Sequence, residues 1–113
     1  MTASIGELRA CGADVDGALE RFMDDEELYL ECLALFRDDP ARAGLATAVA
    51  AGDARAAFEA GHTLKGVAAN LGLVPVSAVL SEWVELLRAG SLEGAAARRQ
   101  ALDRAVEDLP LKP

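Results

Sequence analysis

The sequence contains few aromatic residues, one histidine, two cysteines and a minority of positive charges. Aromatic side chains make up 4% of its 113 residues, although hydrophobic residues reach 52%. Sheets favour aromatic and β-branched side chains, whereas alanine, which is abundant here, is the strongest helix former. The composition therefore predicts closely packed helices, and the length predicts a single domain over residues 1–113.

The scarcity of positive charge and of metal-binding side chains excludes several functional classes. Acidic residues outnumber basic ones by 19 to 11, which gives a formal charge of −8, whereas non-specific nucleic-acid binding needs a basic surface. One histidine and two cysteines without CxxC spacing exclude zinc fingers and histidine-rich catalytic zinc sites. Cys11 and Cys32 are expected to be reduced thiols, because disulfide scaffolds usually contain more cysteines.

No segment has the pattern of a targeting sequence or a membrane span. Met1–Glu7 lacks the basic region and the apolar run of a signal peptide. The longest weakly polar stretch, Val67–Leu80, contains polar residues and falls short of the roughly 20 apolar residues that cross a bilayer. We therefore expect a cytoplasmic protein that does not contact a membrane.

Helix start and stop signals divide the chain into helices with short connections. Short helices are expected around Ile5–Ala10 and within Asp14–Met23. Asp24 resembles an N-cap, and Glu27 three residues later completes a capping box, so this acidic run is interpreted as a helix start rather than a metal site. From there an apolar stripe follows the helical period at Leu28, Cys32, Leu35 and Phe36.

Proline, aspartate and glycine mark the later boundaries. Pro40 either ends the preceding helix near Asp38 or lies in a kink, and we favour one bent helix or two nearly coaxial pieces reaching Ala51. The remaining signals are N-caps at Asp53 and Ser91, glycine ends at Gly52, Gly72 and Gly90, and Pro75 in a first helical turn. The expected fold is all-α: an antiparallel four-helix bundle over about residues 25–109, with short additional N-terminal helices.

The helix predicted over Ala54–Leu71 carries the single histidine on the face opposite to its apolar stripe. At about 100° per residue, the apolar stripe lies within about 60° of Leu64 and comprises Ala57, Ala60, Val67, Ala68 and Leu71. His62 lies about 160° from Leu64 on the same projection. The imidazole is therefore predicted to face solvent and not the core.

The neighbours of His62 indicate a place where a bulky group approaches the imidazole. Gly66 lies one turn further on the same face, and a glycine inside a helix costs about 1 kcal/mol relative to alanine. Lys65 places an ammonium within reach of any group attached to the ring. A partner-binding surface is expected around them, at Arg55, Phe58, Glu59 and Ala69.

These residues provide a nucleophile and a cation without an acid–base partner. An ordinary imidazole is largely neutral at cytoplasmic pH, so it can attack a phosphoryl group without activation by a base. Lys65 would stabilise the phosphate electrostatically. Because the sequence has no glycine-rich phosphate loop, Walker pattern or kinase catalytic set, we expect a phosphoacceptor and not an enzyme with its own ATP site.

The segment around the histidine resembles the signature of histidine-containing phosphotransfer (HPt) domains. Residues 62–72 read HTLKGVAANLG, with a hydrophobic residue two positions after the histidine, then Lys-Gly and a closing glycine. The flanks are also similar: an acidic helix start, a Gly52-Asp53 turn and a glycine at position 90. Two residues differ from the family pattern, because Gly61 adds a second helix-weakening residue and Val67 is bulkier than the small residue often found there.

The resemblance implies a four-helix bundle that acts as a phosphorelay intermediate in two-component signalling. His62 would accept the phosphoryl group on its outer ring nitrogen, Lys65 would contact the phosphate and Gly66 would leave room for the partner. The implied partners are response-regulator receiver domains and a hybrid histidine kinase, and the protein is expected to be a monomer. No cofactor or metal is expected in this chain, because the magnesium ion belongs to the receiver domain.

Two other interpretations stay open at this point. The chain is alternatively the phosphoacceptor domain of a chemotaxis-type kinase, although its end at Pro110–Pro113 favours the phosphorelay intermediate. A non-phosphorylated helical adaptor would instead bind a signalling protein through the same exposed face. Such an adaptor would not need His62, Lys65 and Gly66 together.

Overall fold

Within residues 5–110, which are those that the computed structural model describes, every element of regular structure is an α-helix. The helices are α1 (Ile5–Ala10), α2 (Val15–Arg21), α3 (Glu26–Arg37), α4 (Pro40–Ala50), α5 (Ala54–Asn70), α6 (Val74–Arg88) and α7 (Ala95–Glu107). The predicted all-α class is confirmed. Residues 1–4 and 111–113 of the predicted domain lie outside the described residues.

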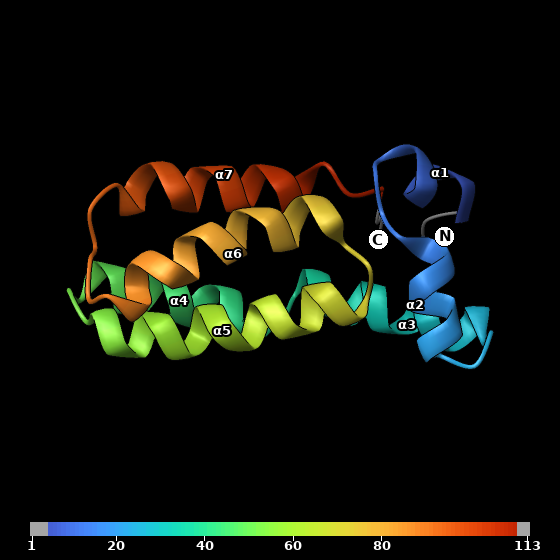
Figure 1. Ribbon diagram of the computed structural model, residues 1–113, viewed down its shortest axis with the longest axis horizontal. Coiled ribbons are helices and arrows are strands. Elements are labelled where there is room, and N and C mark those ends of the chain that lie inside the picture. The colour runs from blue at the N-terminus through green and yellow to red at the C-terminus, as the bar shows by residue number, and fades with distance from the viewer. Residues whose placement is uncertain (1–4, 111–113) are drawn as a thin grey trace.

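Helices α4, α5, α6 and α7 run along the long axis of the molecule, and each runs in the opposite direction to the one before it (Figure 1). Helix α5 packs against α4 on one side and α6 on the other, and α6 packs against α7. Helix α4 lies behind α5 in this view, and α3 lies in line with α4 toward the end where α1 and α2 are found (Figure 1). No helix in residues 5–110 has both the length and the apolar content needed to cross a membrane.

Aspartate side chains begin four consecutive helices, the first of which is α2, where Asp14 accepts from the Gly17 amide at 3.2 Å. Asp25 accepts a hydrogen bond from the Leu28 amide at 3.0 Å, Asp39 from Ala41 at 2.8 Å, and Asp53 from Ala56 at 3.0 Å. Each carboxylate therefore satisfies an amide that has no partner inside the helix. The N-cap at Asp53 is confirmed.

Two predicted N-caps are wrong. Helix α3 begins one residue later than expected, because Asp24 has a φ of 62° and Asp25 provides the cap. Ser91 does not begin α7: its hydroxyl accepts a hydrogen bond from the Glu93 amide at 3.2 Å inside a turn. Helix α7 starts only after Gly94, whose φ of 71° redirects the chain. Ser91, which was predicted to cap a helix, therefore stabilises the turn that precedes α7.

The Pro40 ambiguity is resolved in favour of two helices. Asp38 and Asp39 separate α3 from α4, and Pro40 occupies the first turn of α4. Proline is tolerated at that position because the first helical amides have no acceptor within the helix. The two helices remain in line along the molecule (Figure 1).

One face of α5, made of small and apolar residues, is buried, and its burial fixes how α5 is rotated about its own axis. Ala57, Leu64 and Ala68 are each 0% exposed. Gly61 belongs to the same stripe, and a Cβ built on it would lie 3.3 Å from Cγ2 of Val84 in α6. The glycine that weakens the helix locally therefore allows α5 and α6 to approach closely.

The N-terminal helices hold the C-terminal end of α5. The Arg21 side chain donates to the carbonyl oxygens of Ala69 and Asn70, both at 3.0 Å. The Tyr29 hydroxyl donates to the Leu71 carbonyl at 2.8 Å, and the backbone amide of Asp14 donates to Gly72 at 2.8 Å. Carbonyls at a helix end lack partners within the helix, so α2 and α3 satisfy groups that α5 leaves open.

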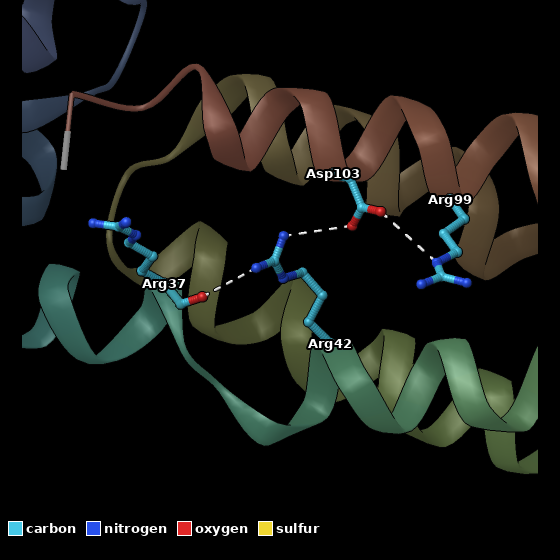
Figure 2. A network of polar contacts seen from close by, with 4 residues as sticks. All are labelled: Arg37, Arg42, Arg99 and Asp103. Carbon is cyan, nitrogen blue, oxygen red and sulfur yellow. Dashed lines mark hydrogen bonds and ion pairs between the residues drawn. The ribbon is translucent and has the colours of Figure 1, made fainter. Parts of the chain in front are cut away.

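The seam between α4 and α7 is an open groove that an ion pair between Arg42 and Asp103 crosses. Arg42 of α4 lies 3.4 Å from Asp103 of α7, and Arg99 lies 3.7 Å from the other oxygen of the same carboxylate (Figure 2). Arg42 also donates to the Arg37 carbonyl at 3.3 Å (Figure 2). Exposed ion pairs contribute about 0–1 kcal/mol each, so α7 is held mainly by its packing against α6.

The buried hydrogen bond of Tyr29 yields a prediction about stability. Replacing Tyr29 by Phe leaves the Leu71 carbonyl without its donor and should lower the free energy of unfolding by about 1–2 kcal/mol at neutral pH. Burial raises the pKa of the Tyr29 phenol, so the wild type should lose further stability as pH rises above about 10, where the unfolded chain ionises first.

Urea denaturation of both proteins between neutral and alkaline pH measures these effects. Tyr29 is the only tyrosine, so the alkaline part of the wild-type loss should be absent from the Tyr29→Phe variant. An identical alkaline loss in both proteins would contradict this role of Tyr29.

Candidate functional site

His62 lies on the solvent side of α5, as the helical register predicted. Its side chain is exposed, while Leu64 on the opposite side of the helix is 0% exposed. Since α5 runs for 17 residues between α4 and α6, the position of the imidazole is fixed by a regular and well-packed element. The single histidine of the chain is therefore available to another molecule.

One flank of the imidazole is covered by an aromatic ring. Phe58 stacks against His62 with ring centroids 5.7 Å apart and ring planes 17° apart. The Arg88 guanidinium of α6 lies over the Phe58 ring, 4.9 Å from its centroid, and donates to Glu85 at 3.0 Å. Phe58 is consequently half-buried, whereas the sequence predicted an exposed ring at this position.

The other flank opens into a groove between α5 and the α3–α4 junction. His62, Gly66 and Val67 line it from α5, and Cys32 and Leu35 line it from α3. The apolar stripe predicted for α3 is confirmed at Phe36 and wrong at Leu28 and Leu35, so the contribution of α3 to this groove was not predicted. Tyr29, Leu33 and Phe36 form the buried stripe of α3, while Leu28 is 44% exposed and Leu35 73% exposed.

Leu35 is exposed because α3 turns the face of Tyr29, Leu33 and Phe36 toward the core, and Leu35 lies about 200° around the helix from Leu33. Leucine on a helix is usually read as a core residue, so an exposed leucine beside a reactive group needed the structure to be found. Together with Cys32 and Phe36 it makes an apolar wall next to the imidazole. We call the space between this wall and α5 the Leu35 groove.

Lys65 and Gly66 differ in their surroundings. Lys65 is half-buried, and its ammonium has no ion-pair partner among residues 5–110. Gly66 is exposed, and a Cβ built on it would have no atom within 4 Å outside its own helix. No packing contact in the described part of the chain therefore requires glycine at position 66, in contrast to position 61.

The remaining predicted surface residues lie on the exposed side of α5. Arg55 and Glu59 form an ion pair at 3.5 Å, with side chains 91% and 67% exposed. Ala69 is exposed, and its carbonyl oxygen accepts from Arg21. Their assignment to partner binding stays a prediction.

The described residues hold few groups that could bind a metal. No cluster of three or more histidine, cysteine, aspartate or glutamate side chains within residues 5–110 is placed to hold an ion. Cys11 and Cys32 are both free, half-buried thiols. The chemistry offered by the site is thus that of an accessible imidazole beside an unpaired ammonium.

Comparison with known proteins identifies the family. The sequence matches the Hpt domain family over residues 7–110, so nearly the whole described chain is included. The chain belongs to this family. No match was found among curated proteins or among solved structures.

Membership in the family defines the class of activity. Hpt domains are helical bundles that carry phosphoryl groups on histidine in two-component phosphorelays, and they are carriers rather than kinases. Their partners are receiver domains and histidine kinases. The exposed His62 of α5 is the only histidine in this chain.

The two interior glycines of α5 should respond oppositely to substitution. Gly66→Ala should raise the free energy of unfolding by up to about 1 kcal/mol, because alanine favours the helix and nothing obstructs its side chain. Gly61→Leu should lower it by about 1–3 kcal/mol, because the side chain collides with Val84 and Leu87. Urea denaturation measures both, and a destabilised Gly66→Ala variant would show that position 66 has a packing role.

Proposed function

We propose that this protein is a phosphorelay intermediate in which His62 accepts a phosphoryl group from a receiver phosphoaspartate and passes it to another receiver. The observation that carries the proposal is the exposed imidazole, which is covered by Phe58 on one flank and adjoins the Leu35 groove on the other. The source of the phosphate in the cell is proposed to be a hybrid histidine kinase.

The transfer forms a bond between phosphorus and the outer nitrogen of the imidazole, and the bond between phosphorus and the aspartate oxygen breaks. The aspartate leaves as a carboxylate, and the ring proton passes to solvent. A neutral imidazole needs no base for this attack. The Lys65 ammonium would stabilise the charge on the transferred group, and magnesium would be held by the receiver domain.

The receiver domain is proposed to dock over the Leu35 groove. The groove is lined by His62 itself, so a partner that reaches the outer ring nitrogen from this side also covers Cys32 and Leu35. Gly66 has no side chain to obstruct that approach. The proposed docking surface thus adds residues of α3 to the surface predicted from the sequence, all of which belongs to α5.

The phosphoacceptor role predicts complete loss of labelling when the imidazole is removed. His62→Gln should accept no phosphate from a phosphorylated receiver domain, because the chain contains no second histidine. Thr47→Val removes an exposed hydroxyl on α4 and should be labelled like the wild type. Labelling of His62→Gln at the wild-type rate would contradict the phosphoacceptor role of His62, whereas a wild-type protein that takes up no phosphate would favour the non-phosphorylated helical adaptor.

The charge at position 65 should affect the rate of transfer. Lys65→Ala should slow phosphate transfer roughly tenfold, because it removes a cation that stabilises the transferred group. Lys65→Arg keeps the charge and should retain most of the rate. Rapid-quench kinetics with a phosphorylated receiver measure both variants, and equal rates for alanine and arginine would exclude an electrostatic role for Lys65.

The docking surface can be tested with two leucines of the same helix. Leu35→Ser should weaken receiver binding about tenfold, because the side chain is 73% exposed in the free protein and becomes covered in the complex. Leu28→Ser is the matched control, since Leu28 is 44% exposed and does not line the groove. Calorimetric titration gives both affinities, and equal losses would contradict docking over the Leu35 groove.

A further inference from the structure

The contact between Phe58 and His62 lies within one turn of one helix. Side chains in an α-helix lean toward its N-terminus, so the imidazole of residue 62 lies over the residue four positions earlier. In this chain that residue is Phe58, and the two rings are nearly parallel. Four positions later, at Gly66, there is no side chain. The imidazole is therefore confined on its N-terminal side and open on its C-terminal side.

The Phe58 ring is itself held by another helix. Arg88 near the end of α6 places its guanidinium 4.9 Å from the ring centroid, and Glu85 one turn earlier binds that guanidinium at 3.0 Å. A cation within about 6 Å of an aromatic centroid attracts the ring. Two helices thus determine where the Phe58 ring lies.

We propose that Phe58 is a positioning residue that orients the His62 imidazole toward the Leu35 groove, and that Arg88 holds Phe58 in place. The proposal rests on the phosphorelay function of His62. An exposed histidine otherwise has two soft torsions, and its outer nitrogen would point to the groove only part of the time. Stacking reduces this freedom before the partner arrives, which is how positioning contributes to reaction rates.

This role differs from partner binding, which the sequence predicted for Phe58. A residue that contacts the receiver would raise the KM for the receiver when removed, with little change in kcat. A residue that orients the imidazole would instead lower kcat at saturating receiver, with little change in KM. The two roles are therefore separable in one kinetic experiment.

The orientation itself can be observed without phosphate. His62 gives the only imidazole proton resonances of the chain, and the stacked ring should displace them by its ring current. Phe58→Leu should move these resonances toward their random-coil positions, whereas Phe58→Tyr should preserve them. Arg88→Gln should move them in the same direction as Phe58→Leu but by less. Arg98→Gln, which breaks the comparable ion pair with Glu82, should leave them unchanged.

The kinetic arm uses the same variants with a phosphorylated receiver. Phe58→Leu should lower kcat about three- to tenfold at unchanged KM, and Phe58→Tyr should stay within about twofold of the wild type. Thermal unfolding followed by circular dichroism establishes that each variant is folded. If Phe58→Leu does not fold, Arg88→Gln tests the positioning role in its place, and its kcat should fall about twofold.

The proposal is overturned if a folded Phe58→Leu variant keeps the wild-type imidazole resonances, or if its loss appears in KM alone. It is also overturned if Arg88→Gln and Arg98→Gln behave alike in both arms. A wild-type protein that accepts no phosphate would instead reject the phosphorelay function, and the resonance measurements would still report whether Phe58 orients the ring.

Discussion

The rotation of α5 about its own axis is the constraint on which the site depends. The stripe that contains Ala57, Gly61 and Leu64 is buried between α4 and α6, and at 3.6 residues per turn this leaves His62 on the outside. Gly61 makes the arrangement specific, because any larger side chain meets Val84 of α6. The position of the reactive group thus follows from the packing of residues that have no chemical role.

The residues around His62 come from helices that are distant in the sequence, and α2 and α3 are attached to the C-terminal end of α5. Arg21 and Tyr29 satisfy carbonyls at its C-terminal end, which ties α2 and α3 to the helix that carries the imidazole. The exposed Leu35 of α3 lines the same groove as His62. The imidazole consequently has an apolar groove on one flank and the Phe58 ring on the other, and the proposed docking side is the flank that adjoins the groove.

Much of the helical pattern could be predicted, because it depends on local signals. Asp53, Gly72 and Pro75 mark helix ends whatever the rest of the chain does, and the period of α5 alone indicated that His62 is exposed. The exposure of Leu35, in contrast, depends on which face α3 turns toward the core, and that is set by its packing against the other helices. The covering of Phe58 depends on Arg88, 30 positions later in the chain, and so requires the packing of α5 on α6.

The central claim is that phosphate is carried by the imidazole of His62. The most direct test is to incubate the wild-type protein with a phosphorylated receiver domain, separate the two, and locate the incorporated phosphate by mass spectrometry under neutral conditions. We expect one phosphoryl group on His62 that is lost in acid and retained in alkali. Phosphate that survives acid, or that is found on any residue other than His62, would contradict it.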